Sequence, residues 1–238
     1  MGTGFILESM DIHSVSEFTH LSAPREVQAL VQDDTTVAVT TVGDMDNNCY
    51  LIACDGQGLL IDAADDAEHL LDMAKALKVE ITDVLTTHQH FDHTRALQEV
   101  LEATGATHHA PRKDAEGIPA PADEVYGNDE GIPELLRLTG HAAELQPKVV
   151  ELRGHTPGGL AVLLENVEDA PRAFTGDSIF PGGVGKTDSP EAFSQLLTDV
   201  EQRILSLPQG TRIHPGHGDS TTVGAELPHV DEWRQRGW

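Results

Sequence analysis

The chain has 238 residues and carries 40 acidic against 15 basic side chains, which gives a formal net charge of −25. Most of such a surface would repel a polyanion, so nucleic acid is not expected as a partner. The sequence contains no uninterrupted apolar stretch of about 18 residues and no secretory signal pattern at its start, so we expect a cytoplasmic protein with no membrane partner. Cys49 and Cys54 lie in an apolar run and are expected to be buried free thiols.

The first half of the chain predicts strands followed by a helix. Short apolar runs separated by glycine-containing turns are typical of antiparallel strands, and here they cover Val37–Val42, Cys49–Cys54 and Leu59–Asp62. Leucines at helical spacing behind an acidic first turn then predict an amphipathic helix over Asp65–Leu77. A buried strand over Ile81–Thr86 and a helix from about Asp92 to Ala103 follow.

The second half repeats this pattern after a segment that is difficult to interpret. Several prolines and glycines in residues 105–145 predict a loop-rich insertion near the active site. The elements expected after it are strands over Val149–Leu152, Leu160–Leu164, Arg172–Thr175 and Arg212–His214, and a helix over Pro190–Leu205. No linker or repeat divides residues 1–238, which predicts one α/β domain with two sheets face to face and helices outside, although periodicity alone also allows other α/β arrangements.

A cluster of histidines and a carboxylate follows the strand that ends near Thr86. In the segment His88-Gln89-His90-Phe91-Asp92-His93, an extended backbone sends His88 and His90 to the same side, where both can bind one ion. A turn then brings Asp92 and His93 to a neighbouring position. Imidazole and carboxylate are the ligands that zinc favours, at about 2.0–2.2 Å, so this segment predicts ligands for two adjacent metal ions.

Three later loops supply further ligands. Each follows a predicted strand and contains glycines that let the backbone approach a buried site: Gly154-His155-Thr156-Pro157-Gly158-Gly159, Thr175-Gly176-Asp177 and Pro215-Gly216-His217-Gly218. Asp177 is a carboxylate that can bridge two ions. The other histidines have no partner at ligand spacing and are expected to be surface or supporting residues: His13, His20, His69, His108, His109, His141, His214 and His229.

Together these motifs resemble the metallo-β-lactamase superfamily, and in particular its glyoxalase II-like hydrolases. The resemblance covers roughly Val37 to Glu226 and depends on the order H-x-H-x-D-H, G-H-T-P-G, G-D and P-G-H-G. It implies a four-layer αββα sandwich in which the ligand loops share one edge of the sheets. It also implies a first ion on His88, His90 and His155, a second ion on Asp92, His93 and His217, and Asp177 as the bridge.

Residues near the ligands suggest supporting roles. The aspartate that the family has after an early strand is matched by Asp62, which would accept a hydrogen bond from a ligand histidine or cap the following helix. Arg95 stands where the family has small residues, and either meets an anionic substrate group or pairs with an acidic neighbour. Lys186, in a glycine-rich loop, either contacts substrate or is exposed to solvent. That loop is not a phosphate-binding loop, because Phe180 stands where the motif needs glycine.

The expected chemistry is hydrolysis of a small-molecule thioester or ester, with the thioester favoured by resemblance. Two divalent ions, zinc first and iron or manganese next, would activate a water, and Asp92 could orient that water or take its proton. A lactonase shares these ligands. A persulfide dioxygenase would keep one iron, on residues close to His88, His155 and Asp177, and the complete second set argues against it. A classical β-lactamase, an RNA-processing enzyme and a non-catalytic metal-binding module fit the motifs and charge less well.

Overall fold

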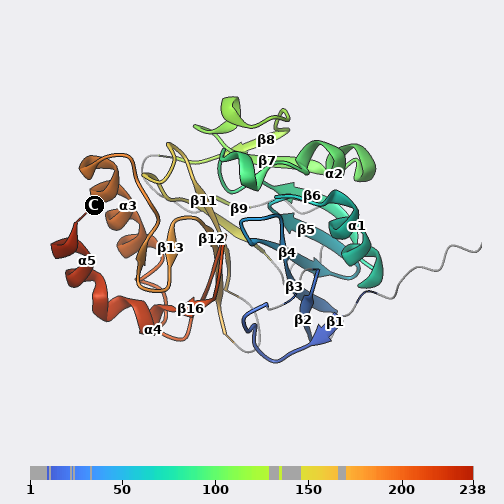
Figure 1. Ribbon diagram of the computed structural model, residues 1–238, viewed down its shortest axis with the longest axis horizontal. Coiled ribbons are helices and arrows are strands. Elements are labelled where there is room, and N and C mark those ends of the chain that lie inside the picture. The colour runs from blue at the N-terminus through green and yellow to red at the C-terminus, as the bar shows by residue number, and fades with distance from the viewer. Residues whose placement is uncertain are drawn as a thin grey trace, which may run out of the picture.

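Two β-sheets pack face to face in the computed structural model, and helices cover the outer face of each (Figure 1). The structure describes residues 10, 12–21, 23, 25–32, 34–128, 134–135, 146–165 and 170–237. The helices α1 and α2 lie on the outer side of the first sheet, and α3, α4 and α5 lie on the outer side of the second (Figure 1). The αββα sandwich expected from the motifs is therefore confirmed.

The first sheet has eight strands in chain order. Strands β2 to β5 pair antiparallel, whereas β5 to β8 pair parallel and β1 runs parallel to β2. The strands are β1 (Ile12–Ser14), β2 (Val27–Gln32), β3 (Thr35–Val42), β4 (Asn47–Cys54), β5 (Gln57–Ile61), β6 (Glu80–Leu85), β7 (Thr107–Pro111) and β8 (Glu124–Tyr126).

The second sheet has six strands in the order β16-β15-β12-β11-β10-β9, and a separate hairpin, β13 with β14, lies beside it. Its pairs are antiparallel except for β12 with β15, which run parallel. The strands are β9 (Glu134–Leu135), β10 (Lys148–Glu151), β11 (Leu160–Leu164), β12 (Arg172–Gly176), β13 (Ile179–Phe180), β14 (Gly183–Val184), β15 (Arg212–Pro215) and β16 (Thr221–Thr222).

Five α-helices and three short 3₁₀ turns complete the described part of the chain. They are α1 (Ala67–Ala76), η1 (Phe91–His93), α2 (Leu97–Thr104), η2 (Ala115–Gly117), α3 (Pro190–Arg203), α4 (Val223–Glu226), η3 (Leu227–His229) and α5 (Val230–Arg236). The N-cap of α1 is Asp66, whose side chain accepts from the backbone N–H of His69, and the N-cap of α3 is Ser189, which accepts from Ala192. The capping role considered for Asp62 therefore belongs to Asp66.

Three layers of buried apolar side chains hold the sandwich together. One lies between the first sheet and helices α1 and α2, and another lies between the second sheet and helices α3 and α5. The central layer joins the two sheets and includes Ile52, Leu59 and Phe174, all inaccessible to solvent. Cys49 and Cys54 are buried within these layers and form no disulfide, as expected.

The parallel pairs determine where the polar loops emerge. The carboxyl ends of parallel strands share one edge of a sheet, and β5 and β6 are such a pair in the first sheet, as are β12 and β15 in the second. The loops that follow β6, β12 and β15 carry His88, Asp177 and His217. The fold thus delivers residues far apart in sequence to one edge of the sandwich.

The predicted helix from Asp92 to Ala103 exists, but its predicted start is wrong. Phe91–His93 forms a 3₁₀ turn, Thr94 leaves helical geometry with φ −134° and ψ 3°, and α2 begins at Leu97. The cause is a competing backbone interaction, because the N–H groups of Arg95 and Ala96 donate to the carbonyls of Ala64 and Ala63. This pairing anchors the turn to the segment after β5 instead of letting a helix form there.

The segment 105–145 is less irregular than predicted. Residues 107–111 and 124–126 are strands of the first sheet, which the sequence hides because the first of these strands contains two histidines and ends in proline. Residues 129–133 and 136–145, with His141, lie outside the described residues. Strand β2 and helix α5 were also not predicted. Four histidines assigned to surface or supporting positions are buried: His69, His108, His109 and His214.

Among the helices that the structure describes, none combines the length and the apolar character needed to cross a bilayer.

The central layer predicts a large cost for removing one of its side chains. Replacing Ile52 with alanine leaves a cavity between the sheets, so the free energy of unfolding should fall by about 2–5 kcal/mol. Urea denaturation of the two proteins measures this change. The matched control is Val31→Ala on strand β2, where the side chain is 55% exposed, and its effect should stay within about 0.5 kcal/mol. Equal losses in both variants would contradict the assignment of the inter-sheet core.

Candidate metal centre

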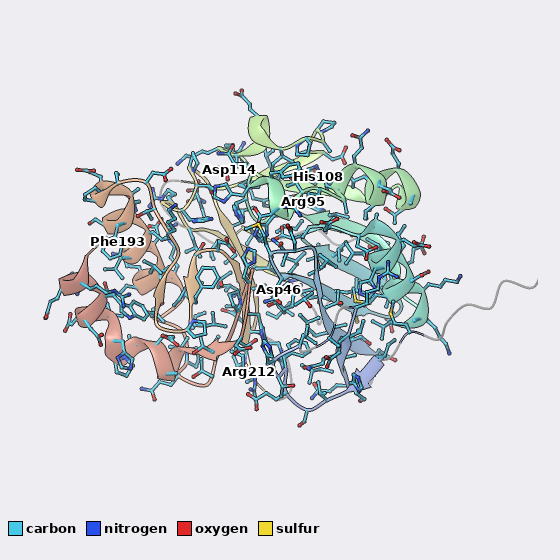
Figure 2. All side chains as sticks on the ribbon, viewed as in Figure 1. Asp46, Arg95, His108, Asp114, Phe193 and Arg212 are labelled. Carbon is cyan, nitrogen blue, oxygen red and sulfur yellow. The ribbon has the colours of Figure 1, made fainter. Side chains whose placement is uncertain are left out.

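Seven histidine and aspartate side chains from four loops meet at the shared edge of the sandwich. His88 and His90 follow β6, Asp92 and His93 belong to the η1 turn, His155 follows β10, Asp177 follows β12, and His217 follows β15. All seven residues predicted as metal ligands are therefore brought together, from both sheets. Figure 2 labels Asp46 near the middle of the molecule, where its two halves meet, and Asp114 above it in the upper part of the view.

The donor atoms fall into overlapping groups of three. His88, His90 and His155 form one group, and Asp92, His93 and His217 form another. A third group, His88, His93 and Asp177, overlaps both, and the ligand atoms within each group lie within 4.8 Å of one another. Each of these groups could hold a metal ion.

The carboxylate of Asp177 lies between the two groups. Its Oδ2 is 3.5 Å from His155 Nε2 in the first group and 3.5 Å from His217 Nε2 in the second. Its Oδ1 is 3.5 Å from His93 Nε2. One carboxylate therefore reaches both groups.

Hydrogen bonds fix the tautomers of three histidines directly. A carbonyl or carboxylate oxygen can only accept, so each Nδ1 that contacts one must carry the proton. His155 Nδ1 donates to the carbonyl of Lys186 at 2.7 Å, His217 Nδ1 to the carbonyl of Met45 at 2.8 Å, and His93 Nδ1 to Asp62 at 2.8 Å. In the neutral form of each residue the Nε2 lone pair then faces the other ligands, as a metal site requires.

Asp62 orients a fourth histidine through a hydroxyl group. The Thr87 backbone N–H donates to Asp62 Oδ1 at 2.7 Å, and the Thr87 hydroxyl donates to Oδ2 at 2.8 Å. Because that hydroxyl proton is committed to Asp62, the Thr87 oxygen accepts from His88 Nδ1, which lies 2.9 Å away. One buried carboxylate therefore positions His93 directly and His88 through Thr87.

The electrostatics of the cluster favour bound positive charge. Burial raises the pKa of Asp92 and of Asp177, but a hydrogen bond from Asn47 to Asp92 and the histidines beside both carboxyls bring each pKa below its ordinary value. Burial alone would lower the pKa of His93, but Asp62 and Asp177 raise it to about 10. Burial and the surrounding histidines hold the pKa of His88 well below its usual range, so it is a neutral imidazole suited to ligation.

The spacing and the unpaired atoms both fit metal ions. Ligands about 2.1 Å from a tetrahedral ion lie about 3.4 Å from one another. The observed separations include 3.1 Å from His88 Nε2 to His90 Nδ1, 3.1 Å from His93 Nε2 to His217 Nε2 and 3.3 Å from His217 Nε2 to Asp92 Oδ2. Two buried atoms of the cluster, His155 Nε2 and Asp177 Oδ1, have no hydrogen-bond partner in the described part of the chain. A cation would satisfy both.

Glycine is required where the backbone passes closest to the ligands. A Cβ on Gly216 would overlap Asp177 Oδ1 and come within 2.8 Å of His93 Cε1. Gly176 adopts φ +48°, and a Cβ there would lie 2.7 Å from the Thr87 hydroxyl. The glycines of the G-D and P-G-H-G motifs therefore leave room for the ligands.

The two predicted substrate contacts lie at the edge of the site. Arg95 pairs with two acidic neighbours, Asp44 at 3.1 Å and Asp65 at 3.0 Å, and its guanidinium lies 5.1 Å from the centre of the Phe91 ring. Of the two roles considered for it, pairing with an acidic neighbour matches this geometry. Lys186 is exposed, and its backbone carbonyl holds His155.

Two residues that organise the site, Asp114 and Asn47, were not predicted from the sequence. Asp114, fully buried, accepts from the backbone N–H groups of Gln89 and Gly158 and so ties two ligand loops together. Asn47, also buried, donates to Asp92 Oδ2 at 2.9 Å. Asp114 lies in the segment predicted as a loop-rich insertion, and Asn47 is the first residue of β4, directly after a turn. At neither position did a motif or a periodic pattern indicate a role in the site.

Comparison with known proteins identifies the family. The model of the metallo-β-lactamase superfamily matches residues 42–221, about three quarters of the chain. The chain belongs to the metallo-β-lactamase superfamily. It is therefore a metal-dependent hydrolase with a centre that binds divalent metals.

Within the superfamily the chain is similar to glyoxalase II-like proteins. It is 29% identical over 208 residues to the hydroxyacylglutathione hydrolase GloC of Haemophilus influenzae, covering 80% of this chain and 94% of that protein. It is 31% identical over 172 residues to a hydroxyacylglutathione hydrolase of a Polaromonas species, covering 71% of this chain and 60% of that one. A crystal structure of TTHA1623 in a di-iron-bound form matches with a TM-score of 0.61 and 33% identity, over 79% of this chain and 96% of that one.

The contact of Gly216 with the ligands predicts a specific loss of metal binding. In Gly216→Ala the new methyl group must displace Asp177 or His93, so the affinity for added zinc should fall at least about tenfold. Isothermal titration of the metal-free protein measures this affinity. The control is Gly210→Ala, where a Cβ would meet nothing within 4 Å, and it should bind zinc like the original protein. Unchanged binding by Gly216→Ala would contradict the placement of the ligands.

The role of Asp62 predicts that its loss affects both groups of ligands. Asp62→Ala removes the acceptor that orients His93 and, through Thr87, His88, so zinc affinity should fall by about 10- to 100-fold for each ion. Metal analysis after dialysis against graded chelator concentrations measures the loss. Retention of both ions at the original chelator concentration would show that Asp62 does not orient the ligands.

Proposed function

We propose that the chain is a dinuclear hydrolase that cleaves a thioester or a related ester of a small molecule. The observation that carries the proposal is the pair of three-residue groups joined by Asp177. We assign the first ion to His88, His90 and His155, the second ion to Asp92, His93 and His217, and the bridge to Asp177. The di-iron-bound relative supports a two-metal centre, and zinc, iron and manganese all suit this set of ligands.

The bound ions would supply Lewis acidity and lower the pKa of a water from about 15.7 towards about 7. Asp92 can orient that water or accept its proton, because its carboxylate lies among the ligands and is held by Asn47 at 2.9 Å. His93 and His88 stay fixed through Asp62, so the ligand geometry does not need to reorganise during the reaction. His90 reaches the solvent-facing side of the site, where a substrate carbonyl can approach.

The names of the relatives favour a thioester as substrate. Hydroxyacylglutathione hydrolases are among the proteins this chain matches, and a thioester offers a carbonyl with a thiolate leaving group. The net charge of −25 supports a small molecule rather than a nucleic acid as partner. We also propose a cytoplasmic location, which the composition favours. A lactone is the alternative ester substrate for the same centre.

A substrate panel tests this function. The purified protein should hydrolyse acyl thioesters faster than lactones or a cephalosporin, and His90→Ala should lower kcat/KM at least about 100-fold because it removes a first-ion ligand. The matched control is His229→Ala, an exposed histidine outside the site, which should keep full activity. Equal rates for His90→Ala and the original protein would overturn the proposal, and one bound iron with oxygen-dependent turnover would favour a persulfide dioxygenase instead.

A further inference from the structure

Asn47, at the start of β4, contacts two of the three residues assigned to the second ion. Its side chain is buried, with 1% of the residue exposed. Nδ2 lies 2.9 Å from Asp92 Oδ2 and 3.4 Å from His217 Nε2. The backbone of Asn47 also forms an isolated β-bridge with His217. The residue therefore joins the first sheet to the loop that follows β15 in the second sheet.

The orientation of the Asn47 amide follows from its partner. Asp92 is a carboxylate that only accepts, so the amide must present its N–H group and not its oxygen. The amide Oδ1 is buried and has no hydrogen-bond partner among the described residues. Nearly all buried polar groups in proteins have a partner, so an unpaired amide oxygen needs an explanation. The Asn47 amide therefore donates to Asp92 in an orientation that leaves its own Oδ1 without a partner among the described residues.

The neighbours of Asn47 hold the same side of the centre. The carbonyl of Met45 accepts from His217 Nδ1 at 2.8 Å. The side chain of Asn48 donates to the carbonyls of Pro215 and Gly218, on either side of His217. By contrast, the histidines of the first ion are anchored elsewhere: His88 by Thr87 and His155 by the carbonyl of Lys186. The turn between β3 and β4 therefore acts on one half of the centre.

We propose that Asn47 is a positioning residue that sets the affinity of the second metal subsite, and with it whether the chain holds one ion or two. This inference rests on the dinuclear centre of the proposed function. Asn47 acts through Asp92: the donated hydrogen bond fixes the carboxylate in the orientation in which it lies 3.3 Å from His217 Nε2 and 3.6 Å from His93 Nε2. Without this donor the carboxylate is free to rotate away, while His217 stays anchored by Met45.

Metal titration of four variants tests the proposal without measuring activity: Asn47→Leu, Gln57→Leu, Asp92→Ala and the double variant of Asn47 and Asp92. Asn47→Leu has nearly the same size but no N–H donor. It should bind the first zinc ion with unchanged affinity and the second about 10- to 100-fold more weakly in isothermal titration of the metal-free protein. The matched control is Gln57→Leu, which makes the same chemical change at the first residue of β5, and it should bind both ions like the original protein. In the Asp92→Ala background, Asn47→Leu should add less than about a twofold further loss, because the two residues act as a unit.

The outcomes separate this inference from the function it rests on. If the original protein binds two ions and Asn47→Leu binds both with the original affinities, the positioning role is overturned while the dinuclear centre stands. An undiminished effect of Asn47→Leu in the Asp92→Ala background would also overturn it, because the residue would then act by another route. Uptake of a single ion by the original protein would overturn both proposals. Retained first-ion binding shows that a variant is folded. Asn47→Ala, which adds no bulk and has no side-chain donor, replaces Asn47→Leu if the latter loses both ions.

Discussion

The hydrogen bonds of the Asp62 carboxylate are the interaction on which the rest of the centre depends. This side chain is 2% exposed and follows strand β5 in a left-handed conformation, φ +59°. It accepts from His93, which belongs to one group of ligands, and from Thr87, which holds His88 of the other. An aspartate buried in this way is costly unless its oxygens are paired, and here every contact it makes orients a metal ligand or the backbone next to one.

The fold brings the ligands held by Asp62 together with ligands from the second sheet. The parallel pairs β5 with β6 and β12 with β15 direct their loops to one edge, and the inter-sheet core holds those edges together. Asp114 then links the loop of His88 to the loop of His155, and Asn47 links Asp92 to the strand next to β5. The Nε2 atoms of His93 and His217, separated by 124 positions in the chain, lie 3.1 Å apart as a result. A cation bound among these ligand atoms would be stabilised by all of them at once.

Much of this arrangement was predictable. Four of the seven ligands lie within six residues of the sequence, and each of the other three follows a predicted strand. The H-x-H-x-D-H segment and the three glycine-rich loops indicated the residues of the site, and their resemblance to the metallo-β-lactamase superfamily implied the αββα sandwich with these residues at one edge. What the pattern could not provide was contact between segments distant in the chain: the Arg95 and Ala96 N–H groups pair with the carbonyls of Ala64 and Ala63, and the start of the predicted helix is a 3₁₀ turn instead. For the same reason Asp114 and Asn47 were missed, since an isolated polar residue in a turn shows its role only when its distant partner is known. Strand β7 was hidden by its two histidines and its proline, which interrupt the apolar alternation, and β8 is only three residues long.

The central claim is that the seven ligands hold a pair of ions around one shared carboxylate. The most direct measurement is anomalous X-ray diffraction from crystals of the protein, collected above and below the absorption edge of the metal found in solution. The account predicts two anomalous peaks about 3.5–4 Å apart, one beside His90 and His155, one beside Asp92 and His217, with Asp177 between them. A single peak, or peaks away from these residues, would contradict it.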